Sequence, residues 1–247
     1  MSNFVLLSDS GNVDFMIKGL FSYELFGQTV WITTSHVCIF IVFLLIITFS
    51  LFANRAIKKA EQTPVEEWKA PGTFQNIVEM IVEMLDHMIT SVMGKNAPKF
   101  ANYIGTLFIF ILISNISGLL GLRPPTADYG VTLPLGVISF CLIFFNKIKH
   151  QKVSGFLKGL CDPWPIWAPI NIIGDVAVPI SLSLRLFANV LSGTVMLALF
   201  YGLLPIFVKV GIPGALHLYF DLFSGAIQTY VFCMLTMTYI TDAIGES

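Results

Sequence analysis

The stretch WPIWAPINIIGDVAVPISLSLRLFANVLSGTVMLALFYGLLPIFV, from Trp164 to Val208, places Arg185 near the middle of an almost uninterrupted apolar run. A guanidinium at bilayer depth costs about 2.5–3.5 kcal/mol on insertion scales, so it normally faces a partner or a water-filled path. Arg185 is therefore the first candidate functional residue of the chain. The alternative is a structural ion pair that holds Arg185 between packed helices.

The composition is that of a polytopic integral membrane protein. Of the 247 residues, 55% are hydrophobic and only 12% are charged, and the mean hydropathy is +0.80. Soluble domains carry about 25% charged residues. We expect a single membrane domain over 1–247, without a separate soluble catalytic unit. The cysteines are scattered without CxxC spacing and are predicted to be free thiols: Cys38, Cys141, Cys161 and Cys233.

Apolar runs long enough to cross a bilayer recur along the chain, since a spanning helix needs about 20 residues. The predicted spans are 30–53, 103–122, 130–145, 164–208 and 212–240. Ten lysines and arginines fall in the two loops that these spans place on one side, and three fall on the other, namely Lys18, Arg123 and Lys209. Because cytoplasmic loops carry the excess of positive charge, we expect the amino terminus outside and the carboxyl terminus in the cytoplasm.

A segment between the first two spans, 73–93, has a different pattern. Acidic residues share one face, and apolar residues recur on the other with the 3.6-residue period of a helix. The acidic face carries Glu79, Glu83 and Asp86, and the apolar face carries Ile77, Ile81, Met84, Leu85, Met88 and Val92. We expect an amphipathic helix on the cytoplasmic surface of the membrane or of the protein, ended by Gly94 and Pro98.

The run 164–208 is too long for an upright crossing. As one helix it would measure roughly 65 Å, about twice the hydrocarbon thickness. A second crossing would need a buried reversal, and no cluster of turn-forming residues interrupts its second half. We therefore expect one long helix bent at Pro169 and Pro179. A turn that contains Pro205 and Gly211 joins it to the last run, 212–240, so that the two form a long tilted hairpin.

Two polar stripes follow the arms of this hairpin at helical spacing. The first arm carries Ser181, Arg185, Asn189 and Ser192, and the second carries His217, Asp221, Ser224 and Gln228. At bilayer depth the polar surroundings available are the other stripe, water, or a protein partner that carries a charge. Chains of carboxylate, imidazole, amide and hydroxyl groups hold water and relay protons, so the pattern predicts an ion or proton path.

Members of these stripes also have structural interpretations. Asn189 and Gln228 are suited to hydrogen bonds between helices. His217 stands near the start of its helix, where it could be solvated at the outer interface. His217 and Asp221 have the i, i+4 spacing of metal ligands, but no third ligand is near in the sequence, so we expect neither a metal site nor a cofactor.

The motif S-L-R-L-F-A-N, Ser183 to Asn189, together with Gln228 on a last helix that ends T-M-T-Y-I, closely resembles subunit a of the F-type ATP synthase. The resemblance covers the whole chain. It includes the loop motif P-V-E-E-W (Pro64 to Trp68), Asn115 in the second span, and P-I-N-I-I (Pro169 to Ile173) at the start of the long helix.

This resemblance implies a stationary, non-catalytic subunit of a rotary ion motor in the plasma membrane of a bacterium. Such a subunit provides two offset half-channels for the ion against a ring of c subunits, each with one membrane-embedded carboxylate. Its other partners would be the b subunits of the peripheral stalk. The resemblance implies H⁺ as the translocated ion and leaves Na⁺ open.

The family's pattern also implies roles at matching positions. Arg185 would be the stator arginine that faces the passing ring carboxylate. Asn189 and Gln228 would be its neighbours at the interface with the ring. Asp221 matches the place on the last helix where the family carries a histidine or an acid in the outer half-channel.

One departure from the family concerns Thr194, where other members often have a glutamate or a histidine. A threonine side chain cannot titrate at this position. The resemblance then implies that Asp221, helped by His217, carries the outer relay alone.

Two other classes of function compete with this hypothesis. A secondary ion transporter would carry its site between inverted repeats, and the two arms here have unlike flanking sequences. A lipid-modifying enzyme would need acid, base or metal-binding residues in the cytoplasmic loops, which contain mainly lysines and His150. Neither loop contains a nucleotide motif, so we do not expect this chain itself to make or split ATP.

Overall fold

The computed structural model describes residues 19–25, 28–61, 72–120, 123–160, 164–203 and 212–245. The turn residues Pro205 and Gly211 and the loop motif from Pro64 to Trp68 lie outside these ranges. Apart from one β-hairpin, every regular element within the described ranges is helical. The predicted all-α class of integral membrane protein is therefore confirmed.

Long helices account for most of the described residues. A hairpin of β1 (Gly19–Leu25) and β2 (Gln28–Thr33) precedes α1 (Thr34–Glu61), α2 (Thr73–Met93), α3 (Ala97–Ile116), α4 (Tyr129–Leu160) and α5 (Ala168–Leu203). The chain ends in a continuous rod made of α6 (Ile212–His217), a π-helical turn (Leu218–Ser224) and α7 (Gly225–Ile244). Five stretches are long and apolar enough to cross a membrane: Thr34–Arg55, Thr73–Leu120, Tyr129–Gln151, Ala168–Phe200 and Gly214–Ile244.

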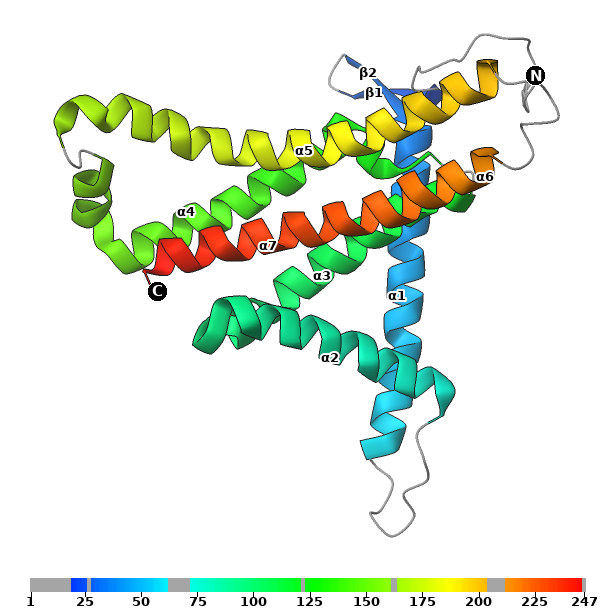
Figure 1. The fold of residues 1–247 in the computed structure, drawn as a ribbon, viewed down its shortest axis with the longest axis horizontal. Coiled ribbons are helices and arrows are strands. Elements are labelled where there is room, and N and C mark those ends of the chain that lie inside the picture. The colour runs from blue at the N-terminus through cyan, green and yellow to red at the C-terminus, as the bar shows by residue number, and fades with distance from the viewer. Residues whose placement is uncertain are drawn as a thin grey trace.

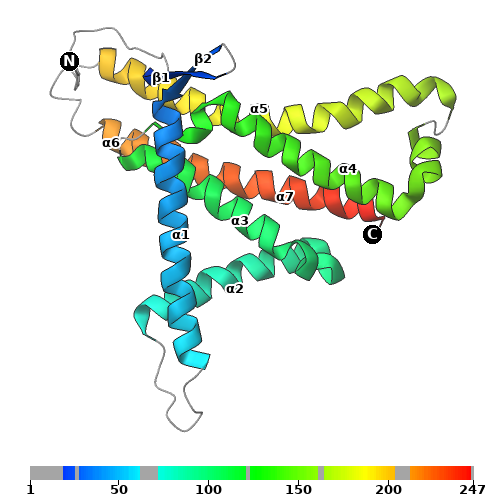
Figure 2. The same ribbon diagram turned by 180° about the vertical axis from the view of Figure 1, so that it is seen from behind.

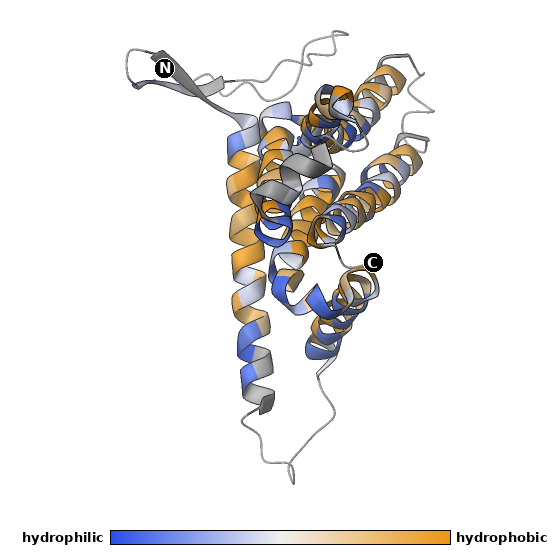
Figure 3. Ribbon diagram, turned by 90° about the vertical axis from the view of Figure 1, so that its left-hand side faces the viewer, coloured by the Kyte–Doolittle hydropathy of each residue, from blue (hydrophilic) through white to orange (hydrophobic). Residues whose placement is uncertain are grey.

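The helices form a slanted bundle against one upright helix (Figures 1 and 2). In both views α5 and the rod of α6 and α7 run side by side in opposite directions, and they lie across α1 rather than along it. Helix α4 packs against both α5 and α7, and α3 packs against α7 and α1. Along α1, hydrophobic residues fill the middle turns and hydrophilic ones follow toward its carboxyl end (Figure 3). The run 164–208 is too long for an upright crossing, and the structure has the slanted hairpin that we expect from this length.

The core lies where α3, α5 and α7 meet. Ile104 and Ile111 of α3, Leu186 of α5, and Phe232 and Met237 of α7 are at most 1% exposed. These side chains belong to one cluster that also includes buried residues of α1, α2 and α4. The helix that carries Arg185 is thus held in place by the residue next to it, Leu186.

Glycines mark the closest crossings of the bundle. A methyl group added to Gly136 of α4 would lie 2.7 Å from the carbonyl oxygen of Pro179 in α5, and one added to Gly193 of α5 would lie 3.2 Å from the Cβ of Phe220. A methyl group added to Gly225 would lie 2.9 Å from the Cβ of Asn115. Small residues let helix backbones approach in a membrane, where no hydrophobic force drives helices together.

The two prolines of the long run have different positions. Pro179 lies inside α5, where it removes a backbone hydrogen bond, and α5 curves along its length (Figure 1). The prediction of a bend at Pro169 is wrong, because Pro169 is the second residue of α5. A proline in the first turn of a helix replaces an N–H that has no helical partner, so it causes no kink.

Helix α2 occupies the range predicted for the amphipathic helix, but a different face is buried. Its buried residues are Val78, Leu85, Ile89 and Met93, whereas Ile77 and Met84 are 45% and 55% exposed. Helix α2 packs on α3 and α7 through this narrower stripe, since one helix can touch its neighbours over only part of an apolar face. The backbone N–H of Gly94, at φ 51°, donates to the Thr90 carbonyl and ends the helix.

Two helices differ in length from the predicted spans. Residues 30–33 of the first span belong to β2, where alternating β-branched and aromatic side chains favour a strand. Helix α4 continues fifteen residues past the predicted 130–145, to Leu160. The added turns contain Lys147, Lys149 and Lys152. Lysine forms helices well but lowers hydropathy, so hydropathy alone cannot detect the extension.

The crossing of α4 and α5 predicts a steric effect of Gly136→Ala. The added methyl group would meet the Pro179 carbonyl, so the helices must separate, and we expect the free energy of unfolding to fall by about 1–3 kcal/mol. Thermal unfolding of the detergent-solubilised protein measures the change. Gly105→Ala in α3 is the matched control, because no atom lies within 4 Å of its added methyl. An equal loss in both variants would contradict the close crossing.

Candidate ion-translocation site

Arg185 lies on the outer surface of α5. Its side chain is exposed and makes no hydrogen bond or ion pair with any residue that the structure describes. The structural ion pair considered as an alternative is thus absent from the described ranges. The exposed face of α5 around Arg185 also carries Ser181, Ala188 and Ser192. Small residues of this kind allow another helix to approach closely.

Asn189 links the two arms of the hairpin. The Ser224 hydroxyl donates to Asn189 Oδ1 at 3.0 Å, and Asn189 Nδ2 donates to the Ser224 carbonyl at 3.4 Å. Ser192 and Thr194 instead donate to carbonyls of their own helix, those of Asn189 and Leu191. The first polar stripe is therefore divided, because Asn189 faces the second arm while Arg185 faces outward.

Asp221 and His217 form a pair on the second arm. The distance between His217 Nδ1 and Asp221 Oδ2 is 2.7 Å, and the Asp221 side chain is only 8% exposed. Asp221 lies in the π-helical turn, which was not predicted, and its carboxyl group lies against the backbone of Gly118. A methyl group on Gly118 would be 2.9 Å from the Asp221 carboxyl carbon, so only glycine leaves room for this carboxylate.

Asn115 connects three parts of the chain at the same depth. Its Nδ2 donates to the Gly225 carbonyl at 3.0 Å and to the Thr229 hydroxyl at 3.2 Å, and its Oδ1 accepts the Thr126 hydroxyl at 2.7 Å. Asn115 and these hydroxyl groups are fully or almost fully buried. The network fixes the start of α7, and therefore the π-helical turn that precedes it.

A small cavity joins the residues of the two arms. Its volume is about 10 Å³, which is just enough for one water molecule. The polar part of its wall comes from Asn115, Asn189 and Asp221, and the rest from Val190, Gly193, Phe220 and Gly225. A water molecule at this point would have three polar partners from three different elements. Asp221 is thus connected, through this cavity, to the residue that lies one turn from Arg185.

Gln228 lies on α7 between Gly225 and Thr229, the two α7 partners of Asn115. Its side chain is 8% exposed, and its Nε2 has no hydrogen-bond partner among the described residues. A buried amide without a partner is costly and is uncommon in native proteins. The structure therefore brings Asn115, Asn189 and Asp221 together and leaves the exposed Arg185 open to a partner protein, whereas the Gln228 amide is buried without a described partner.

A second polar cavity, not predicted from the sequence, lies at the other end of the hairpin. Its volume is about 210 Å³, and α4, α5 and α7 form its walls. Lys147 Nζ donates to both carboxylate oxygens of Asp175, at 2.9 and 3.1 Å, and Tyr239 and Asp242 complete its polar lining. Asp175 is a carboxylate inside the long apolar run, which is the signal that could have identified it.

The two cavities lie at opposite ends of the same helices. Asp221 and Asp242 are separated along the rod by roughly 30 Å, which is about the thickness of the bilayer hydrocarbon. On α5, Arg185 lies between Asp175 and Asn189. The arrangement has a carboxylate-lined cavity at each end and a fixed positive charge between them.

The chain is similar to known proteins over most of its length. Residues 36–241 match the family model described as ATP synthase A chain. "ATP synthase subunit a, sodium ion specific" of Propionigenium modestum is 38% identical over 193 residues, which are 72% of this chain and 65% of that protein. "ATP synthase subunit a 3" of Pelobacter propionicus is 34% identical (82% and 84% of the two chains), and "ATP synthase subunit a" of Mycoplasma genitalium is 31% identical (95% and 88%). The matched part thus spans a little under two thirds of the first relative's length.

Asn115→Ala should remove the buried hydrogen bonds that the Asn115 side chain makes. The Thr126 hydroxyl would lose its acceptor, and we expect the free energy of unfolding to fall by about 1–3 kcal/mol. Thermal unfolding in detergent measures the loss. Asn102→Ala, at an exposed position of the same helix, is the control and should be close to wild type. A wild-type midpoint for Asn115→Ala would show that the network does not stabilise the bundle.

Proposed function

The chain belongs to the ATP synthase A chain family, and we propose that it is the stationary, non-catalytic subunit that guides ions past the c-ring of a rotary ATP synthase. It is a multi-pass membrane protein, and its relatives are bacterial proteins of the ATP synthase membrane sector. The ion that the family translocates is H⁺ or Na⁺. The proposal assigns two half-channels, one barrier and one rotor-facing surface to particular residues.

One observation carries this proposal, namely the position of Arg185. It is exposed on a face rich in small residues, and it lies between two separate polar cavities. A charge at this depth needs a counter-charge, and no described residue supplies one, so we infer that it comes from a partner. A rotor helix that carries a carboxylate could pack closely on the small residues and supply the negative charge that Arg185 lacks.

The chemistry of the rotor carboxylate explains why the arginine is needed. An ionised carboxylate at bilayer depth is costly unless a cation is near, and protonation or ion binding neutralises it elsewhere. Arg185 would stabilise the ionised form only where the ring passes it. Arginine does not give up its proton in proteins, so Arg185 would also block direct leakage between the two half-channels.

The two cavities are the proposed ends of the ion path. On the outer side, His217 and Asp221 would pass the ion to the small cavity beside Asn189. On the inner side, the larger cavity with Asp175 and Asp242 would open to the cytoplasm. Thr194 donates to a helix carbonyl and carries no titratable group, so Asp221 is the only carboxylate proposed for the outer route.

The membrane orientation and the partners follow from the same assignment. We place the amino terminus outside and the carboxyl terminus in the cytoplasm, because ten lysines and arginines fall in the two loops that the predicted spans place on one side. The rotor-facing surface would bind the c-ring, and a peripheral stalk of b subunits would keep the chain stationary. The family match over 36–241 weighs against the alternative, a secondary ion transporter.

We expect Arg185→Ala to abolish ion-driven ATP synthesis and to spare ATP hydrolysis by the uncoupled catalytic head. The variant loses both the partner of the ionised rotor carboxylate and the barrier between the half-channels. Arg185→Lys should fail as well, because a compact ammonium replaces a planar fork of five donors. ATP synthesis by vesicles that contain the whole complex, under an imposed ion gradient, is the measurement.

The control for Arg185 is Lys149→Ala, which removes an exposed cation from α4 outside the proposed path. This variant should synthesise ATP like the wild type. Near-normal synthesis in Arg185→Ala or Arg185→Lys, with the complex fully assembled, would disprove the assignment of the stator arginine.

Asp221→Asn should slow passive ion conduction through the membrane sector by on the order of 100-fold, the usual loss when a proton-transfer group is removed. His217→Ala removes the hydrogen-bond partner of Asp221 and should have a smaller effect. Thr194→Val, which removes a hydroxyl bonded to its own helix, should have the smallest. Conduction is measured in vesicles stripped of the catalytic head. If Asp221→Asn conducts like wild type, the outer path does not pass the π-helical turn.

A further inference from the structure

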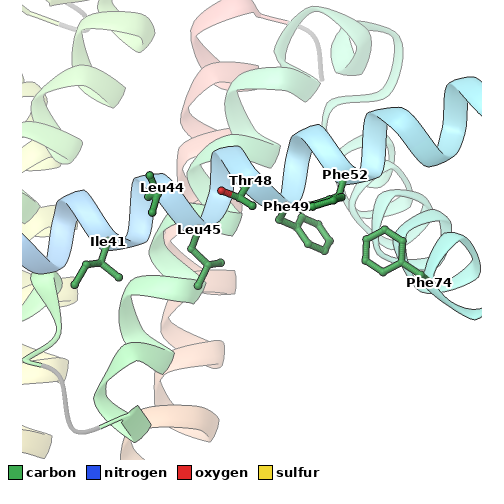
Figure 4. A pocket seen from close by; sticks show the side chains of 7 residues that line it. All are labelled: Ile41, Leu44, Leu45, Thr48, Phe49, Phe52 and Phe74. Carbon is green, nitrogen blue, oxygen red and sulfur yellow. The ribbon is translucent and has the colours of Figure 1, made fainter.

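An apolar groove between α1 and the start of α2 takes no part in the proposed ion path. Its volume is about 760 Å³, and its wall is almost entirely hydrocarbon. The lining residues are Ile41, Leu44, Leu45, Thr48, Phe49 and Phe52 of α1 and Phe74 of α2 (Figure 4). The rings of Phe49 and Phe74 meet edge to face at 5.9 Å and form part of the groove wall.

The length of the groove matches one leaflet of a bilayer. At 1.5 Å per residue, the lining from Ile41 to Phe52 extends for roughly 16 Å along α1. The hydrocarbon core of a bilayer is about 30 Å thick, so one leaflet contributes about half of that depth. A lipid tail that enters from one surface would therefore fill the groove and end near the middle of the membrane.

The side chains in the groove favour a lipid tail over a protein helix. Interfaces between membrane helices are enriched in glycine, alanine, serine and threonine, which let backbones approach. The rotor-facing surface of α5 has this composition, with Ala177, Ser181, Ala188 and Ser192. The groove has only Thr48 of this kind and is otherwise lined by large, branched or aromatic residues. A flexible acyl chain can follow such an uneven wall, whereas a rigid helix cannot.

A cation lies one turn beyond Phe52, at one end of the groove. Ile41, Leu45, Thr48, Phe52 and Arg55 follow one another at spacings of three and four, so Arg55 continues the same face of α1 for one more turn. Its side chain is exposed and makes no hydrogen bond or ion pair with the residues that the structure describes. An arginine just beyond the hydrocarbon is placed to bind a phosphate bidentately.

We propose that this groove is a binding site for a phospholipid with an anionic headgroup. The acyl chains lie along α1 from Phe52 to Ile41, and the phosphate binds Arg55. The inference requires only that α1 spans the membrane, and it is independent of the ion path. A bound lipid would brace α2 against α1 on the side of the molecule away from the α5 and α7 hairpin (Figures 1 and 2).

Lipid retention in the purified complex tests the proposal. The complex is incubated with equal amounts of phosphatidylglycerol and phosphatidylcholine in detergent, and native mass spectrometry counts the lipids that remain bound. One favourable cation near the headgroup corresponds to a preference of about five-fold. We expect the wild type to retain phosphatidylglycerol with about this preference, and Arg55→Gln to retain both lipids equally.

Two matched controls separate the site from a general effect. Lys149 is also exposed but belongs to α4 and does not line the groove, so Lys149→Gln should keep the five-fold preference. Thr48→Trp fills the groove and should release the bound lipid, whereas Ile47→Trp, 56% exposed and outside the groove, should not. ATP synthesis should be preserved in Arg55→Gln, which distinguishes loss of this site from loss of the ion path.

Three results would overturn the proposal. One is equal retention of the two lipids by the wild type. Another is an equal loss of preference in Arg55→Gln and Lys149→Gln, which would indicate attraction to positive charge in general. The third is an efficient cross-link from a cysteine at Leu45 to a neighbouring subunit of the assembled complex, which would show that a protein helix occupies the groove.

Discussion

The unpaired charge of Arg185 is the constraint on which the rest of this structure depends. A guanidinium among apolar side chains at bilayer depth costs several kcal/mol unless something outside the helix compensates it. No described residue does so, since Arg185 is exposed and makes no hydrogen bond or ion pair within the described ranges. Its neighbour Leu186 is completely buried and anchors this part of α5. The fold therefore holds a costly charge at an exposed surface, where no described residue neutralises it.

Buried hydrogen bonds fix the position of the helices that form this surface. Asn115 ties α3 to the start of α7, and Asn189 ties α5 to the end of the π-helical turn, so both arms of the hairpin are set relative to each other. Gly118 and Gly225 remove the side chains that would otherwise displace Asp221 and Asn115. Such contacts are strong in a low dielectric, and they fail together when one partner is lost.

The sequence predicts the features that depend on periodicity and charge. The range of α2 and the continuity of α5 follow from apolar patterns, and Arg185 is evident because one charge interrupts a long hydrophobic run. Features that depend on contacts between distant residues were missed. Nothing local distinguishes the π-helical turn at Asp221, and the pairing of Lys147 with Asp175 joins residues on two helices. Tertiary contacts decide both, and a single sequence does not contain them.

The order of charges along the hairpin limits the route of an ion along the proposed path. The cavity at one end has Asp221, the cavity at the other end has Asp175, Asp242 and the compensating Lys147, and Arg185 lies between them. We propose that a cation approaches from either end and that the arginine repels it from the direct route. Its most favourable exit would then be sideways, toward a carboxylate carried by the rotor. The rotor would be required for conduction as well as for torque, because this chain alone would provide access to the middle of the membrane but no passage through it.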